Sequence, residues 1–535
     1  ALDHAFDYMS HKYESILRGL LRMPGVPVVT GIALAFGAYV LLQELPQEYA
    51  PAEDQGTFMG MISAPEGTSF ERLQRDVLAV EGPLQPHFDS GLVQRGIVGV
   101  PGWGNQGAGV VSVTLVPWAE RDITTQELLL ELNREWSEIP NLRITAFMRL
   151  SAPGGGRGGG GGGQPVQLVL GGPNYEELAR WRDVIFDRAA DNPGLQRLDS
   201  DLKETQPQVL LRIDTERAAA LGVSTESIGR TLQSVMSERR ISTYVVDGEE
   251  YDVLLQAEED QRSTYADLRS IYVRSERSGE LIPLSNLTSL EDQAGPAQLN
   301  RYNRTRAVTI SANLAPEYTL GEALDYLEAI IRSELPNTAQ IDYRGESRDL
   351  RESSGSLMFT FGVAIFVVFL VLAAQFESFV HPLVIMVTVP LAVAGGLFGL
   401  WAADMTLNIY SQIGIIKLVG IASKNGVLIV EFINQMRDEG MQFRDAVVEG
   451  ARIRFRPVVM TAFSTVMGSI PLIMASGPGA VSRMNLGVVI FSGVSIATFF
   501  TLFIVPAFYD LFARRTGSPN AVSRRLQSMR ERLAG

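Results

Sequence analysis

The chain has 535 residues, a formal net charge of −14 at pH 7 and no cysteine, and 46% of its residues are hydrophobic. An acidic chain is a poor candidate for binding nucleic acid, and a chain without cysteine forms neither disulfides nor thiolate metal sites. None of the four histidines stands in a metal-ligand spacing such as HExxH, so the sequence predicts no histidine metal site.

The chain opens with a predicted basic helix and a predicted membrane span. In residues 1–23, Lys12, Arg18 and Arg22 stand among apolar residues at helical spacing, which is typical of an amphipathic helix on a membrane face. Residues 24–45 are uncharged up to Glu44 and long enough to cross a bilayer. A solvated helix is the alternative for residues 1–23, but the adjoining span favours the membrane.

The polar region that follows, residues 46–353, repeats one pattern. In residues 46–165, strands are predicted at 57–63, 92–98, 109–116 and 142–150, and helices at 69–81 and 124–136. This βαββαβ order is the ferredoxin-like split βαβ arrangement. A second unit of this kind is predicted in residues 166–214 with 304–353. It begins with a strand at 166–170, a helix at 175–190 and a strand at 209–213. It is completed by a strand at 308–313, a helix at 320–333 and a strand at 340–343. Residues 215–303 interrupt it as an inserted subdomain, with a helix at 225–237 and strands at 242–246 and 252–256.

Two glycine-rich loops lie in this region. Neither is followed by a GK[ST] signature or by a helix start placed to receive an anion, so neither predicts a nucleotide site. The run 154–163 is interpreted as a linker. The loop 99–109, GVPGWGNQGAG, carries Trp103 between Gly102 and Gly104. It has two interpretations: an exposed turn, or a mobile loop that moves an aromatic ring against an apolar ligand.

After residue 353 the chain returns to the membrane. Five further spans are predicted in residues 354–512, at about 357–374, 383–402, 409–434, 458–475 and 486–508, which makes six with the first. Arginines concentrate in the 434–456 loop and in the basic tail, residues 513–535. Because positively charged loops stay in the cytoplasm, both termini are expected there and the polar region outside. The expected fold class is an α-helical membrane protein with an external α+β region.

The fourth of these six spans carries three charges on one stripe. Lys417, Lys424 and Glu431 are spaced by seven residues, or about 10.5 Å of helical rise, and therefore share a face. A charge near the bilayer centre is costly unless it has a partner or lines a wet cavity, and Lys424 stands near the middle of the span. We interpret Lys424 as an ion or proton site. Snorkelling to the interfaces is the alternative for Lys417 and Glu431.

The fifth span adds polar groups at matching depth. Arg454 and Thr461 share a face, and counting inwards from the cytoplasmic ends puts Thr461 level with Lys424. Interfacial anchoring is the alternative for Arg454, and a bond to its own helix backbone for Thr461. Small residues are expected to let the two spans approach closely: Gly414, Gly420, Gly426 and Gly468.

This polar set contains no acid at the depth of Lys424. A buried lysine without a carboxylate tends to lose its proton. The partner acids are therefore expected from elsewhere, either from another chain or from a missing part of this one.

These residues stand in strings that resemble one family. The strings are PAEDQG after the first span, DSDLKETQP in the second α/β unit, AAQFESFVHPL between the second and third spans, GIASKNGVLIVEFINQMRDEG and RFRPVVMTAFSTVMGSIPL. In this order, over nearly the whole chain, they resemble the C-terminal half of a resistance-nodulation-division (RND) multidrug efflux transporter of the hydrophobe/amphiphile type.

The resemblance implies a homotrimer in the inner membrane of a Gram-negative bacterium, with both termini cytoplasmic and the large loop periplasmic. It implies a periplasmic adaptor, an outer-membrane channel, and the export of amphiphilic small molecules in exchange for protons, driven by the proton motive force without a cofactor. The two α/β units would be porter subdomains, and the insertion would be the docking subdomain.

The resemblance also assigns residues. Lys424, Asn425 and Thr461 would form a proton relay with two aspartates of the N-terminal half, and Arg454 would be its basic residue nearer the cytoplasm. The loop 99–109 would lie between drug pockets. The residues along this substrate path would be Val98, Val100, Gly102, Trp103 and Gly104.

The chain departs from the family pattern in three respects. The N-terminal six spans with the acidic pair are absent, Lys417 stands where an apolar residue is more usual, and the run 154–163 is longer than expected. Lys417 and Glu431 are therefore candidate relay modifiers, since a second lysine on the stripe would compete for the same acids. The alternatives are a non-pumping half-chain that serves as a binding or assembly scaffold, and an RND relative that exports lipids or proteins. An enzyme and a metal exporter have less support.

Overall fold

The computed structural model describes residues 2–51, 53–102, 107–148, 164–264, 266–315, 318–514 and 516. By their contacts, the residues divide into two compact units, Leu202–Gln298 and the rest of the chain. Three features predicted from the sequence lie outside the described residues: the loop residues Trp103 and Gly104, the glycine run 154–163, and the tail from residue 517.

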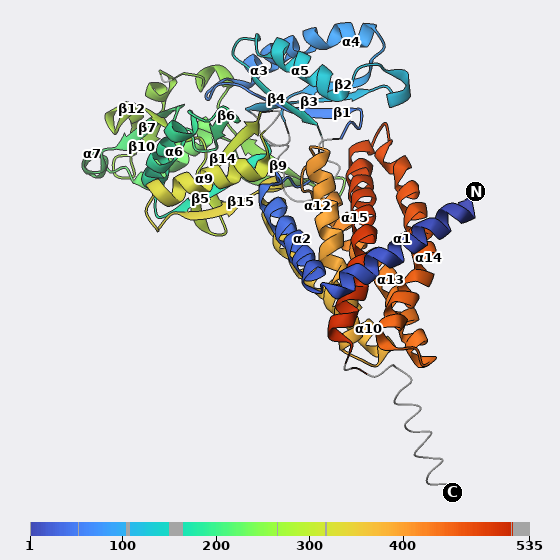
Figure 1. The fold of residues 1–535 in the computed structure, drawn as a ribbon. Coiled ribbons are helices and arrows are strands. Elements are labelled where there is room, and N and C mark those ends of the chain that lie inside the picture. The colour runs from blue at the N-terminus through green and yellow to red at the C-terminus, as the bar shows by residue number, and fades with distance from the viewer. Residues whose placement is uncertain are drawn as a thin grey trace. The chain divides into compact units, whose positions relative to one another are not determined.

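Six helices among the described residues have the length and composition of membrane spans. They are α2 (Gly25–Glu44), α10 (Gly345–Phe376), α11 (Val380–Met386) with α12 (Thr388–Ala402), α13 (Ile409–Asp438), α14 (Phe443–Ile473) and α15 (Ala480–Phe512). The helices α12, α13 and α14 all pack against α15 (Figure 1). The first helix, α1 (Leu2–Arg22), buries Tyr13 and Leu17 in an apolar core shared with α14 and α15.

The helix α14 begins well before the predicted fifth span. Residues from Phe443 on continue the helix because Ala446, Val447 and Ala451 recur at helical spacing and are fully buried. The predicted 434–456 loop is therefore a short turn, residues 439–442, where Gly440 takes the left-handed conformation with φ of 90°.

The first α/β unit has the predicted βαββαβ order. Its strands are β1 (Thr57–Ser63), β2 (Val93–Gly99), β3 (Ala108–Leu115) and β4 (Arg143–Met148), arranged antiparallel in the order β2-β3-β1-β4. The helix predicted at 69–81 is shorter, α3 (Phe70–Val77), because the chain tightens after Val77 into a 3-10 helix that contains Pro83, which has no backbone N–H to donate. The 3-10 helix η1 (Leu78–Leu84) and α4 (Gln85–Asp89) follow, and the remaining helices are η2 (Trp118–Glu120) and α5 (Thr125–Trp136).

One face of this sheet packs on α3 and α5. Apolar alternation along β1 and β3 buries Phe58 and Val111 against Leu128 and Trp136 of α5. The indole of Trp136 donates a hydrogen bond to the carbonyl of Val80 at 3.2 Å. The start of α5 is set by a capping box, in which Thr124 and Glu127 bond each other's backbone N–H groups.

The second α/β unit has the same strand order. It consists of β5 (Val166–Gly172), α6 (Tyr175–Ala189), β6 (Leu195–Ser200), β13 (Arg301–Tyr302), β14 (Thr305–Leu314), α9 (Leu320–Glu334) and β15 (Gln340–Tyr343). The strand β6 pairs with β14, which pairs with β5, which pairs with β15. The prediction that 209–213 is the second strand of this sheet was wrong, because β6 takes that place.

The segment 209–213 belongs instead to the compact unit Leu202–Gln298, as part of β7 (Gln206–Ile213), which pairs with β12 (Thr288–Gly295). This unit also holds α7 (Thr215–Ala220), α8 (Thr225–Met236), the hairpin of β8 (Arg239–Val246) and β9 (Glu249–Leu255), η3 (Glu259–Gln261), η4 (Asp267–Ser270), β10 (Tyr272–Arg274), β11 (Leu281–Pro283) and η5 (Leu284–Asn286). Its core contains the fully buried Ile228, Val273 and Leu287. The helix and the two strands predicted within the insertion are confirmed, and the structure pairs the strands as a hairpin.

A glycine at the centre of the first sheet leads to a stability prediction. A Cβ atom on Gly60 would lie 2.7 Å from Cγ1 of Val111 and 3.0 Å from Cβ of Ala146. Gly60→Ala is therefore expected to destabilise the unit by about 1–3 kcal/mol, because neighbouring strands must move apart. Hydrogen exchange of the β1 and β3 amides measures the loss. Gly82→Ala is the control, since its Cβ meets no atom within 4 Å, and equal effects of the two variants would contradict the prediction.

Candidate functional site

The charged stripe predicted on the fourth span lies on the outward face of α13. Lys417 and Lys424 are exposed and Glu431 is half-buried, while the opposite face buries Leu418 and Ile429 in apolar cores. This distribution is the reverse of what a bilayer favours, because apolar side chains belong against lipid and charges belong inside. The stripe is therefore a surface that needs a covering partner.

Lys424 has no hydrogen-bond or ion-pair partner among the residues that the structure describes. The structure does not join it to Thr461, whose hydroxyl donates to the carbonyl of Val458 in its own helix at 3.0 Å. Thr465 in turn donates to the carbonyl of Thr461 at 2.9 Å. The alternative interpretation of Thr461, a bond to its own backbone, therefore describes the geometry observed in this chain.

Asn425 follows Lys424 in sequence but faces the other way. It is buried, and its Nδ2 donates to Oγ1 of Thr498 on α15 at 3.2 Å. Because adjacent helical residues point about 100° apart, Asn425 cannot lie on the stripe of Lys424. In this chain its amide ties α13 to α15.

Arg454 stacks on the aromatic ring next to Glu431 in sequence. Its guanidinium carbon lies 4.2 Å from the ring centroid of Phe432 on α13, and its buried Nε has no hydrogen-bond partner among the described residues. Such a contact stabilises by about 0.5–2 kcal/mol, more where water is excluded. Arg454 therefore links the two helices that carry the predicted relay.

This contact is testable by a double-mutant cycle. Combining Arg454→Ala with Phe432→Ala is expected to be less destabilising than the sum of the single variants by about 0.5–2 kcal/mol. The measurement is the unfolding free energy of the purified protein in detergent. Strictly additive effects would show that the two side chains do not interact.

The glycines predicted to bring the fourth and fifth spans together contact other neighbours. A Cβ on Gly414 would meet Val489 of α15 at 3.0 Å, and one on Gly426 would meet Ile385 of α11 at 3.1 Å. Gly420 and Gly468 have open space around them. The prediction was therefore wrong about the pairing. Between α13 and α14, the small residue at the close approach is Gly450, whose Cβ would lie 2.9 Å from Cα of Ile433.

The segment between α2 and β1 contains polar contacts that the sequence analysis did not single out. The carboxylate of Glu53 is buried and accepts hydrogen bonds from the backbone N–H, at 2.9 Å, and the hydroxyl of Ser482 in the first turn of α15. An anion at this position is favoured by the positive end of the helix dipole. The next residue, Asp54, accepts from Thr125 N at 2.8 Å, in the first turn of α5.

Asp54 also binds a buried arginine. Its oxygens accept from both terminal nitrogens of Arg121, at 3.0 and 2.5 Å, and from Gly56 N at 3.0 Å. Burial raises the pKa of the Asp54 carboxyl, but hydrogen bonds from Arg121, Thr125 and Gly56 outweigh it and lower the pKa to about 2. The carboxylate is therefore charged at every physiological pH.

The same segment reaches the start of α13. The N–H of Leu407 donates to Pro46 O at 2.8 Å, and that of Ile409 donates to Tyr49 O at 3.1 Å. Glu48 accepts from the hydroxyl of Thr406, and its burial raises the pKa of its carboxyl. We call residues 46–54, of which 52 is not described, the acidic linker. It contacts α13, α15 and α5. Three acids in the seven residues 48–54, shortly after the end of an apolar span, were the sequence signal for it.

The described part of the predicted substrate path packs on the first sheet. Val98 and Val100 are half-buried against its core, and Gly102 N donates to Ala108 O at 2.6 Å. A Cβ on Gly102 would lie 2.8 Å from Gly109 O, so the two ends of the loop pack closely. The role of these residues in a substrate path remains a prediction.

The known proteins that this chain resembles are transporters. The model of the AcrB/AcrD/AcrF family matches residues 1–513. The chain is 30% identical, over 522 residues, to a Haemophilus influenzae protein named only as an uncharacterized transporter. It is also 30% identical, over 519 residues, to two Pseudomonas putida proteins, the multidrug/solvent efflux pump membrane transporter MepB and the toluene efflux pump membrane transporter TtgB. Each alignment covers 96% of this chain and 49% of the relative, so the chain spans about half the length of the curated relatives it matches.

Proposed function

This chain belongs to the AcrB/AcrD/AcrF family of transporters, and from that premise we propose that it is the C-terminal half of an RND-type exporter. The exporter moves drugs or other amphiphilic compounds in exchange for protons. The names of two relatives, a multidrug/solvent pump and a toluene pump, support this substrate class. The other half, with an acidic pair in a span, is supplied by the same chain or by a second one.

The observation that carries the proposal is the unpartnered charge of Lys424. An ammonium group in the middle of a span needs a counter-charge or a wet cavity. Among the described residues, Lys424 has neither a carboxylate partner nor a hydrogen bond. A second set of spans that packs on α13 with two aspartates would provide the counter-charge and cover the stripe.

The proposed mechanism is electrostatic. With the acids ionised, Lys424 is charged and held by them. A proton arriving on one acid cancels its charge and releases Lys424, so that α13 shifts relative to the covering spans. The hydroxyl of Thr461 then replaces its hydrogen bond to its own helix backbone with a hydrogen bond to another relay residue. Arg454 keeps the cytoplasmic side of the relay in place through its contact with the ring of Phe432. Lys417, on the same stripe, competes with Lys424 for the acids, and Glu431 moderates that competition.

The acidic linker supports transmission from the spans to the α/β units. Its residues contact the first turns of α13, α15 and α5. Because Glu53 and Asp54 are consecutive, their Cα atoms are held about 3.8 Å apart. A displacement of α15 therefore displaces α5 as well. This movement opens or closes the pocket of the first porter subdomain.

In the proposed assembly, the chain sits in the inner membrane of a Gram-negative bacterium, with the termini in the cytoplasm and the α/β units in the periplasm. Three copies form the homotrimer, a periplasmic adaptor and an outer-membrane channel complete the export path, and the loop 99–109 lies between the drug pockets. The proton motive force is the energy source, so no cofactor is needed.

A second candidate is a half-chain that binds an amphiphile or holds an assembly together without pumping. The hydrogen bonding of Thr461 favours it, because this residue is already satisfied within its own helix. A relative that exports lipids or proteins would differ in the walls of the pocket.

The test is the subunit content of the complex extracted in mild detergent, together with dye efflux by the expressing cells. Co-purification with a second six-span chain, or origin from a twelve-span one, together with proton-dependent efflux is the result expected. A complex made only of this chain that causes no efflux would favour the scaffold.

A further inference from the structure

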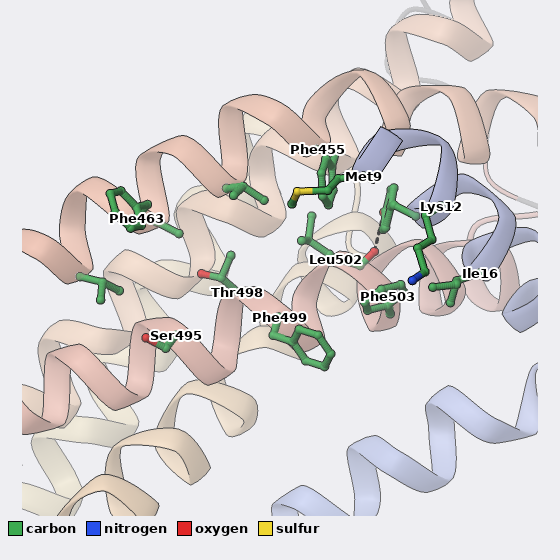
Figure 2. A pocket seen from close by; sticks show the side chains of 14 residues that line it. Met9, Lys12, Ile16, Phe455, Phe463, Ser495, Thr498, Phe499, Leu502 and Phe503 are labelled. Atoms are coloured by element: carbon green, nitrogen blue, oxygen red, sulfur yellow. Dashed lines mark hydrogen bonds between the residues drawn. The ribbon is translucent and has the colours of Figure 1, made fainter. Parts of the chain in front are cut away.

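A cavity of about 450 Å³ lies between α1, α14 and α15 (Figure 2). Its walls are almost entirely apolar, and the three hydroxyl groups of the described lining residues are already hydrogen-bonded. Tyr13 donates to a backbone carbonyl of α15 at 2.6 Å. Ser495 donates to the carbonyl of Phe491 at 2.6 Å, and Thr498 accepts from Asn425 Nδ2 at 3.2 Å. The cavity therefore suits a hydrocarbon rather than a polar ligand.

The cavity is a groove open to the surroundings of the spans. Phe463 of α14 is 64% exposed and Phe499 of α15 is 62% exposed, although both helices have the composition of membrane spans. In a bilayer, the molecules that contact such a surface are lipid acyl chains. Phe455 and Val466, which line the groove along α14, are eleven residues apart, or about 16 Å of helical rise. This length is close to half of the roughly 30 Å hydrocarbon core, the depth of one leaflet.

Among the described residues that line the groove, one carries a charge, and it is a cation. Lys12 extends from α1 toward Phe503 at the end of the groove that α1 covers (Figure 2). The neighbouring cation Arg18 is paired with Glu14 and Asp445, at 3.1 and 3.8 Å. Lys12 forms no ion pair with any residue that the structure describes. An amphipathic helix such as α1 lies at the level of the lipid headgroups, so this ammonium group stands where phosphates are found.

We propose that the groove between α1, α14 and α15 binds one anionic phospholipid from the leaflet in which α1 lies. The acyl chain runs along Phe455, Phe463 and Phe499, and the headgroup phosphate pairs with Lys12. The bound lipid joins α1 to α14 and α15 and is separate from the relay stripe of α13. The site is not part of the proposed export path.

Native mass spectrometry of the whole transporter complex tests the proposal, with phosphatidylglycerol and phosphatidylcholine of equal acyl chains added in turn. One additional phosphatidylglycerol per chain is expected, bound more tightly than phosphatidylcholine. Lys12→Gln is expected to weaken phosphatidylglycerol binding roughly five- to tenfold, without changing phosphatidylcholine binding. Arg22→Gln is the matched control, because it removes the same charge from an exposed site on α1 that does not line the groove.

A second pair of variants tests the apolar wall. Phe499→Ala is expected to weaken both lipids, whereas Phe359→Ala, at a phenylalanine of α10 that is 75% exposed and outside the groove, is expected to change neither. Equal loss of phosphatidylglycerol in Lys12→Gln and Arg22→Gln would overturn the proposal, as would equal binding of the two lipids to the unchanged protein. Binding of an exported dye in the groove with no lipid binding would also overturn it and assign the groove to the substrate.

Discussion

Replacing Lys424 with methionine is expected to abolish proton-dependent efflux, with a loss of at least about tenfold in the initial rate of dye export. Methionine keeps much of the length of lysine but removes the charge that the proposed acids hold. The protein should still reach the membrane, because Lys424 is exposed on α13 and forms no hydrogen bond or ion pair with the residues that the structure describes. The measurement is dye efflux after imposing a pH gradient, normalised to the amount of protein in the membrane.

Lys417→Met is the matched control, because it removes the same charge from the same exposed stripe, two turns away. We expect it to retain efflux and to shift its pH dependence, since the competitor of Lys424 is lost. Unchanged efflux in Lys424→Met would refute the proton relay and would leave the charge of Lys424 a role in assembly alone. Equal loss in both variants would mean that the stripe acts as a whole and that no single lysine is the switch.

Replacing Asp54 with asparagine is expected to destabilise the first α/β unit by about 3–5 kcal/mol. The Arg121 side chain is only 1% exposed, so the substitution leaves a buried guanidinium without its counter-charge. It also removes the anion from the first turn of α5. Backbone amides of α5 are therefore expected to exchange with deuterium roughly 10²–10⁴ times faster.

The control for this prediction is Asp76→Asn. Asp76 pairs with Arg72 at 3.5 Å on the surface, where the Arg72 side chain is 57% exposed. Surface pairs of this kind contribute about 1 kcal/mol or less, so exchange in α5 should hardly change. Similar acceleration in both variants would mean that the Asp54–Arg121 pair does not hold the unit together.

The contribution of Asp54 also depends on pH with a defined sign. The pKa of its carboxyl falls from an ordinary 3.8 to about 2 in the folded protein. A lowered folded-state pKa means that the stabilisation is fully present above about pH 3.8 and is lost as pH falls through about 2. The difference in exchange between the unchanged protein and Asp54→Asn should therefore be large at pH 6 and shrink below pH 3.

The alternation of apolar residues was enough to predict the first sheet but not all of the second. The prediction missed β6 because the sequence LQRLDS buries only its last residue, Ser200. The apolar run in β7 was predicted to be the second strand instead, although β7 pairs with β12, about 80 residues further along the chain. Local periodicity indicates which face of a strand is buried and carries no information on which strand will be its neighbour.

The same limit applied to the candidate site. Seven-residue spacing placed Lys417, Lys424 and Glu431 on one stripe correctly, because helical geometry is local. The glycine contacts were assigned to the wrong helices, since residues such as Gly414 and Gly426 are small on every side and the sequence does not say what fills the space. The contacts of Glu53 and Asp54 could not be foreseen either, since their partners Ser482 and Thr125 are distant in sequence.

The split of the second sheet by the insertion has a consequence for how the nascent chain folds. The strand β6 ends at Ser200, and its neighbour β14 begins at Thr305. The whole of Leu202–Gln298 must therefore be synthesised before β6 can pair with β14. Such a long loop slows closure, because its entropy is lost before any contact forms. Within the insertion, however, Gln206 pairs with Gly295. Once the insertion has folded on its own, it holds the two flanks of the chain side by side, and the remaining search for β14 is short.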